Sequence, residues 1–393
     1  MSWDTKKLGE ICEITAGQSP EGKFYNHTKE GLPFYQGKKL FGDKFLLEPN
    51  TWTSKTTKLA KPDDILMSVR APVGSINITK KEVCIGRGLA AIHPRDSIDR
   101  DFLFYYLKSI ENSLTGSSGA VFNSINKTQI ENIQMLLPSL PVQKQIVERL
   151  DIAFADIDKA ISATEVNIEN AEALFSKTLN NTLEGGLGEE FLLGELCEVL
   201  TKGTTPTSVG HKFIDEGINF IKIESITNQG NFIPEKMAYI DEECHESLKR
   251  SQLIPGDILF SIAGALGRTA IVTDDIVPAN TNQALAIIRL KKHLKINKDY
   301  LKYVLNSNLT LSQSDSLKAG VAQQNLSLSQ LKTYQINIPT QQIQNDIVEK
   351  IDSIKEKINT FIESNQTKLN QYKSLKTSVL NQAFSGELTK DVA

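Results

Sequence analysis

Apolar residues recur at heptad spacing in two stretches of this sequence, and neither stretch is interrupted by glycine or proline. The first stretch follows Pro141 and runs to Leu183, and the second follows Pro339. The first has the rows Val147, Phe154, Ile161, Ile168, Phe175 and Leu150, Ile157, Thr164, Ala171, Thr178; the second has the rows Ile351, Ile358, Asn365, Tyr372, Val379 and Ile354, Phe361, Lys368, Leu375. Rows sustained over this many heptads predict two long helices, each packing against another helix along its length.

The predicted helices are too long to lie on one small domain, because roughly 43 residues at about 1.5 Å per residue give on the order of 65 Å. We expect an antiparallel pair, with two globular halves at opposite ends related by a pseudo-two-fold axis. The polar Thr164 and Asn365 occupy equivalent central positions, and they are candidates for fixing the register at some cost in stability. In the alternative arrangement, each helix packs on its own half. Both helices are expected to stop at matching glycines, Gly185 and Gly386.

The segments before the helices contain many short strand patterns separated by turn residues. DILMSV from Asp64 and DILFSI from Asp257 are apolar strand candidates, and each runs into a loop of small residues. We therefore expect an α+β protein with two mixed α/β domains at 1–138 and 186–338, long helices at 139–185 and 339–386, and a short tail at 387–393.

The chain is an internal duplication with a period of about 190 residues. Segments of the first copy reappear in the same order in the second, among them LGEICEIT from Leu8 as LGELCEVL from Leu193, PDDILMSVRAPVGS from Pro62 as PGDILFSIAGALGR from Pro255, and IVERLD from Ile146 as IVEKID from Ile347. Both copies also keep a glycine followed three residues later by a proline, which indicates a shared turn.

The first of these turns has the spacing of a phosphate-binding loop. TAGQSPEGKF, from Thr15, contains G-x-x-x-x-G-K. However, Phe24 stands where a hydroxyl would hold Mg²⁺, and no helical pattern follows. The second copy, TKGTTPTSVG from Thr201, has no lysine at the matching place. We interpret both segments as turns rather than as nucleotide sites.

Composition narrows the class of protein. Hydrophobic residues make up 40% and charged residues 23% of the 393 residues, as in soluble globular proteins. No apolar run is long enough to span a membrane and no signal core is present, so a cytoplasmic location is expected. Cys12, Cys84, Cys197 and Cys244 are too dispersed for a disulfide framework or a zinc site. No catalytic grouping or DNA-methyltransferase motif is found, so we expect neither catalysis nor a bound metal.

The formal net charge is −3, whereas proteins that hold DNA unaided usually carry a clear basic excess. DNA contact would therefore come from local patches or with the help of partners. The candidate DNA-binding residues are Tyr35, Gln36, Lys38, Lys39, Arg70 and Arg87 in the first copy, and Lys222, Arg268, Asn280 and Asn282 in the second. Arginine pairs well with guanine, and asparagine or glutamine with adenine. The alternative for each residue is an ordinary solvated side chain.

Together, these features resemble the specificity subunit of type I restriction-modification systems over essentially the whole chain. The resemblance rests on the turns TAGQSP and TKGTTP, the strand segments PDDILMSVRAPVG and PGDILFSIAGALG, the helix entries LPSLPVQKQIVERLD and IPTQQIQNDIVEKID, and the closing LNQAFSGELT from Leu380. One departure is that Ala71 and Pro72 follow Arg70 where the second copy has Gly264 and Ala265, so Arg70 lacks a clear counterpart.

The resemblance implies that each globular half is a target-recognition domain reading one part of a split DNA site. It implies that the helix pair sets the unread spacer and docks two DNA-methyltransferase subunits, which restriction subunits join. No cofactor is expected on this chain, because S-adenosylmethionine, ATP and Mg²⁺ would belong to the partner subunits.

Two other hypotheses remain open from the sequence. The chain could be the recognition partner of a related restriction enzyme whose other chain both cuts and methylates. A coiled-coil scaffold that never touches nucleic acid is the hypothesis from another class, and the size and loop content of the globular halves disfavour it.

Overall fold

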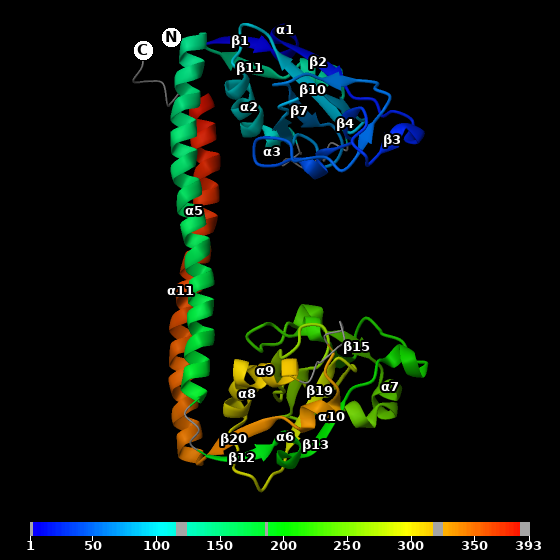
Figure 1. Ribbon diagram of the computed structural model, residues 1–393, viewed down its shortest axis with the longest axis vertical. Helices are drawn as coiled ribbons and strands as arrows, with labels where there is room; N and C mark the ends of the chain where they lie inside the picture. The colour runs from blue at the N-terminus through cyan, green and yellow to red at the C-terminus, as the bar shows by residue number, and fades with distance from the viewer. Residues whose placement is uncertain (1–2, 115–123, 185–187, 317–324, 386–393) are drawn as a thin grey trace. The chain divides into compact units, whose positions relative to one another are not determined.

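The computed structural model describes residues 3–114, 124–184, 188–316 and 325–385. It divides into two compact units, one formed by residues 1–165 with 366–393 and the other by residues 166–365. Each unit contains one copy of the sequence repeat together with part of both long helices (Figure 1).

The first copy forms two sheets and a separate strand pair. Its strands are β1 (Asp4–Lys7), β2 (Cys12–Ala16), β3 (Tyr25–Asn26), β4 (Leu32–Tyr35), β5 (Trp52–Thr53), β6 (Leu59–Ala60), β7 (Ile65–Ser68), β8 (Ile76–Ile78), β9 (Val83–Ile85), β10 (Leu89–Pro94) and β11 (Gln134–Leu137). Its short helices are α1 (Leu8–Ile11), α2 (Arg100–Ser109), α3 (Glu111–Leu114) and α4 (Lys127–Glu131). One sheet has the order β2-β10-β7-β8, the other has the order β3-β5-β4-β9-β6, and β1 pairs with β11.

Strand β7, within the predicted DILMSV segment, connects the two core clusters of this copy. Ile65 and Met67 belong to the main cluster together with Phe102 of α2, which lies beside the sheet and contacts its strand β8 (Figure 1). Leu66 belongs to a second cluster with Ile85 of β9. Alternate side chains therefore enter opposite cores, which explains why this strand reads as a continuous apolar run.

The second copy repeats this plan. Its strands are β12 (Gly188–Leu192), β13 (Cys197–Lys202), β14 (Ile218–Ile221), β15 (Ala238–Ile240), β16 (Ile258–Ser261), β17 (Thr269–Ile271), β18 (Ala279–Thr281), β19 (Leu285–Leu290) and β20 (Gln335–Pro339). Its short helices are α6 (Leu193–Leu196), α7 (Glu242–Ser247), α8 (Lys298–Asn306), α9 (Asn308–Ser316) and α10 (Leu328–Lys332). The order β13-β19-β16-β17 matches β2-β10-β7-β8, and β12-β20 matches β1-β11. The duplication seen in the sequence is thus a duplication of the fold.

The two predicted long helices are α5 (Leu140–Leu183) and α11 (Gln341–Phe384), each of 44 residues. In the first unit, Leu150 of α5 shares a core cluster with Leu380 of α11. In the second unit, Leu179 of α5 shares a cluster with Ile351 of α11. The beginning of one helix therefore packs with the end of the other in both units, as the antiparallel prediction requires. The predicted stops Gly185 and Gly386 lie outside the described residues.

The buried stripe on α11 follows a different line from the predicted one. Ile351 and Asn365 are buried, and Ile354, Ile358 and Tyr372 are half-buried. Phe361, however, is 46% exposed, so placing it at the helix-pair interface was wrong. The stripe passes instead through Ile362 and Leu369, four residues after Ile358 and Asn365, because a seven-residue repeat alternates steps of three and four. On α5, Ile157 is buried, and Phe154, Ile161, Ile168 and Phe175 are half-buried.

The two polar residues predicted at central heptad positions are both buried. Thr164 is 6% exposed and donates its hydroxyl to the carbonyl oxygen of Ala160 at 2.7 Å. Asn365 is 3% exposed and donates to the carbonyl oxygen of Phe361 at 2.8 Å. Each buried side chain therefore donates one hydrogen bond to a carbonyl oxygen of its own helix.

Candidate nucleic-acid interface

In the first copy, two parallel strands bring together residues that are distant in the sequence. β4 and β9 pair in parallel, with Tyr35 opposite Ile85. The residues that follow these strands, Gln36 and 86–88, therefore meet at one edge of the sheet. The backbone amide of residue 86, a glycine, donates to the carbonyl oxygen of Tyr35 at 2.8 Å.

The glycine turn after β2 closes on this edge. The amide of Gly17 donates to the carbonyl oxygen of Leu89 at 2.9 Å. A Cβ on Gly17 would lie 2.2 Å from the carbonyl oxygen of Gly86, so only glycine permits this approach. Downstream, Gly22–Phe24 form a single 3₁₀ turn instead of the helix that a phosphate-binding loop needs. The interpretation of this segment as a turn is confirmed.

Two of the predicted arginines lie together. The amide of Val69 donates to the carbonyl oxygen of Gly88 at 2.9 Å, which joins the loop after β7 to the loop after β9. Arg70 and Arg87 are both exposed and line one surface hollow with Ser124. Two guanidinium groups at one hollow are suited to an anionic ligand such as DNA phosphate.

A second hollow lies beside Gln36. Gln36 and Lys39 are exposed and line it together with Tyr25 and Phe34. These two rings stack with their centroids 4.8 Å apart. The hollow thus combines an amide, an ammonium group and an aromatic face.

Tyr35 and Lys38 make their contacts within the domain. Tyr35 is 2% exposed, and its hydroxyl donates to the carbonyl oxygen of Leu47 at 2.8 Å. Burial, and secondly the charge of Glu48, raise the pKa of Tyr35 to about 12. Lys38 is half-buried and donates to the hydroxyl of Ser75 at 3.2 Å. The prediction of a DNA contact through Tyr35 was therefore wrong, because its ring lies inside a core cluster.

The second copy has the same edge with other side chains. β14 and β18 pair in parallel, with Ile221 opposite Thr281, so Lys222 and 282–284 follow at one edge. A Cβ on Gly203, the glycine of the second turn, would lie 1.8 Å from the carbonyl oxygen of Thr281. The turn of the second copy therefore requires glycine at Gly203, as the first turn does at Gly17.

The strand register gives the equivalent positions of the two copies. Because β4 matches β14 and β9 matches β18, Gln36 corresponds to Lys222 and Arg87 corresponds to Gln283. Gln36, Arg87 and Gln283 are exposed, and Lys222 is half-exposed. Each copy thus presents one glutamine and one cationic side chain at this edge, in opposite order.

Of the two predicted asparagines, one lies at this edge and the other lies in the core. Asn280 is fully buried, and its amide nitrogen donates to the carbonyl oxygen of Leu248 at 3.1 Å. The prediction that Asn280 contacts DNA was wrong, since it lies within β18 rather than after it. Asn282 is half-buried at the edge, and its side-chain oxygen accepts from the amide of Ala284 at 3.1 Å.

Arg268 is used to hold a loop of its own domain. Its guanidinium donates to the carbonyl oxygens of Ile223 and Ile226 at 3.0 and 2.8 Å, and to the side chain of Asn228 at 2.6 Å. These three bonds order the segment that follows Lys222. Arg268 is therefore assigned a structural role rather than the predicted contact with DNA.

Sequence reasoning missed three polar residues beside these edges. The hydroxyl of Ser19 donates to the side-chain oxygen of Gln36 at 2.9 Å, and the hydroxyl of Thr205 donates to that of Gln283. Arg250 is exposed and donates to the second glycine turn at 3.2 Å. Ser19 and Thr205 both precede the proline of their turn, and this shared hydroxyl was the signal available in the sequence. Arg250 gave no such signal.

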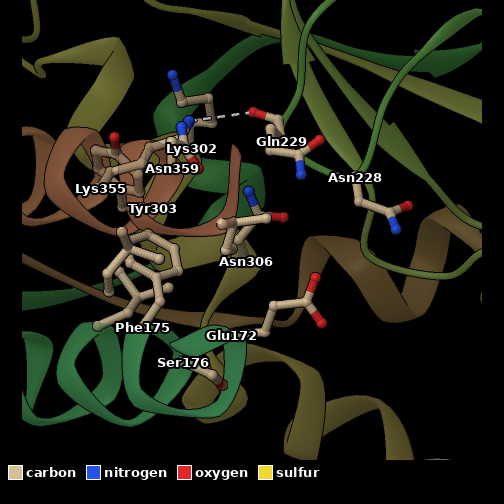
Figure 2. Close-up of a pocket in the computed structure, with 13 residues that line it drawn as sticks. Glu172, Phe175, Ser176, Asn228, Gln229, Lys302, Tyr303, Asn306, Lys355 and Asn359 are labelled. Carbon is tan, nitrogen blue, oxygen red and sulfur yellow. Dashed lines mark hydrogen bonds between the residues drawn. The ribbon is translucent and has the colours of Figure 1, made fainter. Parts of the chain in front are cut away.

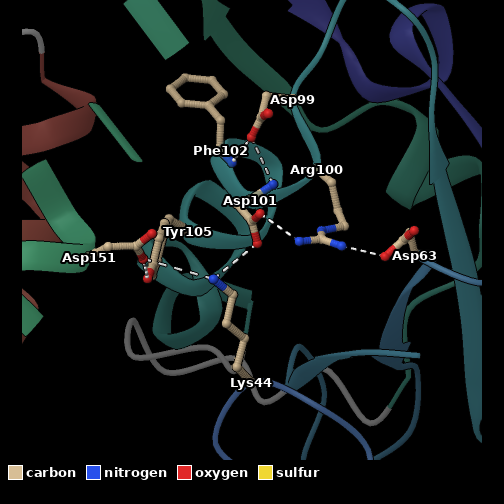
Figure 3. Close-up of polar contacts among 8 residues, drawn as sticks. All are labelled: Lys44, Asp63, Asp99, Arg100, Asp101, Phe102, Tyr105 and Asp151. Carbon is tan, nitrogen blue, oxygen red and sulfur yellow. Dashed lines mark hydrogen bonds and ion pairs between the residues drawn. The ribbon is translucent and has the colours of Figure 1, made fainter. Parts of the chain in front are cut away.

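A tyrosine–aspartate bond joins the first domain to its helix. The hydroxyl of Tyr105 on α2 donates to the carboxylate of Asp151 on α5, as Figure 3 shows. Lys44 lies 3.0 Å from Asp101 and 3.9 Å from Asp151. Burial raises the pKa of Asp101, but hydrogen bonds from Arg100 and Lys44 outweigh it and hold the pKa below its usual value. The network fixes the domain on the helix.

The second domain has the same bond with other neighbours. Tyr303 on α8 donates to Asp352 on α11. Burial and the bond to Asp352 raise the pKa of Tyr303. Lys302 and Lys355 extend over the Tyr303 ring. Lys355 also donates to the carbonyl oxygen of Gln229 at 3.3 Å, and both residues line the pocket in Figure 2. Burial, and then the charge of Lys302, lower the pKa of Lys355.

Neither a metal site nor a membrane-spanning helix is present in the residues that the structure describes. No group of three or more histidine, cysteine, aspartate or glutamate side chains could hold a metal ion there. No helix in the same residues is long and apolar enough to cross a membrane. The four cysteines are all buried, and no disulfide joins them.

Comparison with known families identifies the class of protein. The model of the type I restriction modification DNA specificity domain matches residues 1–167 and again residues 188–371. The chain belongs to this family. The two matches follow the two copies of the repeat, and the resemblance noted in the sequence is confirmed.

Individual members of the specificity family are similar over different shares of the chain. The EcoBI specificity subunit of Escherichia coli is 22% identical over 99% of this chain and 86% of its own length. The MjaX specificity subunit of Methanocaldococcus jannaschii, described as putative, is 40% identical over 187 residues. That match spans 47% of this chain and 43% of the archaeal protein.

Two solved structures of type I restriction-modification and HsdS proteins share the fold. A chain from a type I R-M system, described for its complex assembly and conformational transition, aligns with a TM-score of 0.73 at 18% identity over 98% of both chains. The HsdS subunit from Thermoanaerobacter tengcongensis aligns with a TM-score of 0.52 at 18% identity, over 98% of this chain and 97% of its own. The predicted class, two mixed α/β domains with two long helices, is confirmed.

Proposed function

We propose that this chain is the DNA sequence-recognition subunit of a type I restriction-modification enzyme, and that each copy of the repeat reads one part of a bipartite site. One observation carries the proposal. The edge formed by two parallel strands and a glycine turn occurs in both copies, yet it presents Gln36 and Arg87 in one and Lys222 and Gln283 in the other. A shared platform with different side chains suits two unrelated half-sites.

The chemistry of these side chains fits base and phosphate contact. Glutamine can pair with adenine through both atoms of its amide, and arginine can pair with guanine through two donors. Arg70 lines a hollow with Arg87, and Lys39 lines the one beside Gln36, where both can neutralise phosphate. Arg250 has the same capacity beside the second glycine turn.

We assign the helix pair the role of setting the distance between the two half-sites. A pair of 44-residue helices with a buried polar residue near the middle of each suits a spacer of fixed register. In this proposal the two halves lie at opposite ends of the pair, related by a pseudo-two-fold axis.

Partner subunits would dock on the outer faces of the helices. Leu174 is 58% exposed on α5 and Leu375 is 47% exposed on α11, and they occupy equivalent positions of the two copies. Exposed leucines at equivalent positions suit two copies of one partner, which we take to be DNA-methyltransferase subunits. Catalysis, S-adenosylmethionine, ATP and Mg²⁺ would belong to those subunits and to restriction subunits that join them, inside the cell.

A map of methylated adenines in cells, with and without this chain and with its partner methyltransferase present, tests the proposal. A split motif that disappears without the chain is expected, and it would reveal both half-sites. An unchanged methylation pattern would contradict the recognition role and favour a scaffold. Exchanging residues 1–138 for the matching half of a relative should then change one half-site only.

A further inference from the structure

We propose that the hydroxyl residue before the proline of each glycine turn positions a glutamine for base recognition: Ser19 positions Gln36 in the first copy, and Thr205 positions Gln283 in the second. The inference rests on the proposed function and identifies which side chains distinguish bases in each copy. Both glutamines are exposed, and both hydroxyls belong to turns that glycine holds tightly against the strand ends.

In the first copy, one hydroxyl connects three loops. Ser19 donates to the side-chain oxygen of Gln36 at 2.9 Å and accepts from the backbone amide of Arg87 at 3.3 Å. The Arg87 amide occupies one lone pair of the hydroxyl oxygen, and the hydroxyl hydrogen points at the side-chain oxygen of Gln36. With Ser19 as the donor, the bond favours the amide orientation that turns the glutamine oxygen towards the turn.

Gly86 lies beneath the same amide. A Cβ at this position would lie 2.5 Å from the side-chain oxygen of Gln36 and 2.9 Å from its carboxamide carbon. The glutamine side chain therefore lies across the backbone of Gly86, and a larger residue at this position would displace it. The contact with Gly86 and the hydrogen bond from Ser19 together restrict the rotamers of the Gln36 side chain.

The fixed amide keeps the groups that base recognition needs. The side-chain nitrogen of Gln36 retains its two donors, and the oxygen retains a second lone pair beside the one used by Ser19. Adenine offers N7 as an acceptor and N6 as a donor in the major groove, which matches this pair. A glutamine free to rotate by half a turn would exchange its donor and acceptor and would lose that preference.

The second copy reaches the same arrangement from another strand. Thr205 is the equivalent of Ser19, and its hydroxyl donates to the side-chain oxygen of Gln283. Gln283 follows β18 and corresponds to Arg87, whereas the equivalent of Gln36 is Lys222. The turn hydroxyl thus holds a glutamine in both copies, although the glutamine comes from different strands. Because the two glutamines are not equivalent residues, duplication alone does not explain why the hydroxyl bonds a glutamine in both copies. The repeated contact supports a role of the hydroxyl in positioning the glutamine.

The test uses the full-length chain with its partner methyltransferase in cells, read out as a map of methylated adenines. Ser19→Ala should relax one base-pair position of one half-site, with about tenfold lower discrimination there. Gln36→Ala should relax the same position, and the double variant should add nothing further. Ser19→Thr keeps the hydroxyl and should keep the motif. In the second copy, Thr205→Ala and Gln283→Ala should each relax the same base-pair position of the other half-site. Thr205→Ser keeps the hydroxyl and is the matched control.

Three results would overturn the inference. They are an unchanged motif in both Ser19→Ala and Thr205→Ala, relaxation at a position other than the one that the matching glutamine variant relaxes, and a uniform loss of methylation at every site. Uniform loss of methylation would show that the hydroxyl serves only the fold. For a variant with a relaxed motif, an unchanged thermal unfolding midpoint of the purified protein excludes a folding defect as the cause. If the unmodified chain directs no split motif at all, the proposed function fails instead, so the two failures are distinguishable.

Discussion

The side-chain oxygen of Gln143 accepts a hydrogen bond from the backbone amide of Asp99 at 2.7 Å, which connects the start of α2 to the start of α5. The side-chain nitrogen of Gln143 donates to the carbonyl oxygen of Pro138 at 2.8 Å. Gln344 makes the corresponding bonds to Asn297 and Pro339 at 2.7 and 2.8 Å. Both glutamines are buried, so each domain is joined to its helix through one enclosed amide.

Replacing Gln143 with alanine should destabilise the first domain by about 2–4 kcal/mol, because buried backbone groups would lose their partners. Urea unfolding followed by circular dichroism would measure the change. Gln145→Ala is the matched control, since Gln145 is exposed on the same turn of α5 and should change stability by less than about 0.5 kcal/mol. Equal effects of the two substitutions would contradict the structural role assigned to Gln143.

Tyr35→Phe should lower the free energy of unfolding at pH 8 by about 1 kcal/mol, because the hydroxyl bond to Leu47 is lost. Folding raises the pKa of Tyr35 to about 12, above the unfolded value of about 10. The stabilisation is therefore complete below about pH 10 and is lost as the pH rises towards 12. The free energies of unfolding of the unmodified protein and the variant should therefore lie closer together at pH 10.5 than at pH 8. A constant difference would contradict the raised pKa assigned to Tyr35. The methylation motif should not change.

Leu174→Asp combined with Leu375→Asp should abolish assembly with the methyltransferase subunits while leaving the chain folded. Both side chains are exposed, so a charge costs the isolated chain little, whereas burial of an unpaired carboxylate in an interface is strongly unfavourable. Native mass spectrometry of the mixed subunits measures the assembly. The control places the same charges one residue away, at Ala173 and Ser374, which are also exposed. Loss of assembly in both pairs would remove the case for specific leucine contacts.

Asn365→Ile should leave the helix pair folded and raise its thermal unfolding midpoint, because a buried polar side chain is replaced by an apolar one. The expected cost is looser register, which the methylation map would show as tolerance of more than one spacer length. Thr164→Val is the companion change on α5 and should act in the same direction. A single, unaltered spacer in both variants would refute a role of these residues in register.

Periodicity and repetition were sufficient to predict the architecture. The heptad pattern of the long helices continues over five heptads, and the strand segments of the first copy reappear in order in the second. Each pattern is therefore supported by many positions. The position of the buried stripe was harder to predict. Phe361 and Ile362 are both apolar neighbours, and only the packing of the helix determines which of them faces inward.

The recognition edge was predicted only in part, because tertiary contacts assemble it. Asn280 and Asn282 look alike in the sequence, but β18 ends at Thr281, which leaves one inside the sheet and the other beyond it. The bond between Ser19 and Gln36 joins residues 17 positions apart, and no local pattern indicates it. Arg268 is bonded by loop carbonyls that the sequence gives no reason to place nearby.

The enclosed amides of Gln143 and Gln344 also bear on how such proteins diversify. The contact is made almost entirely with backbone atoms, so it does not depend on the side chains that the rest of the domain carries. A half inherited from another gene would fit the same helix wherever the backbone reaches the glutamine in this way. Recombination near residue 138 or 339 could then supply a complete new half at once, without the long series of point substitutions that remodelling a recognition edge would otherwise require.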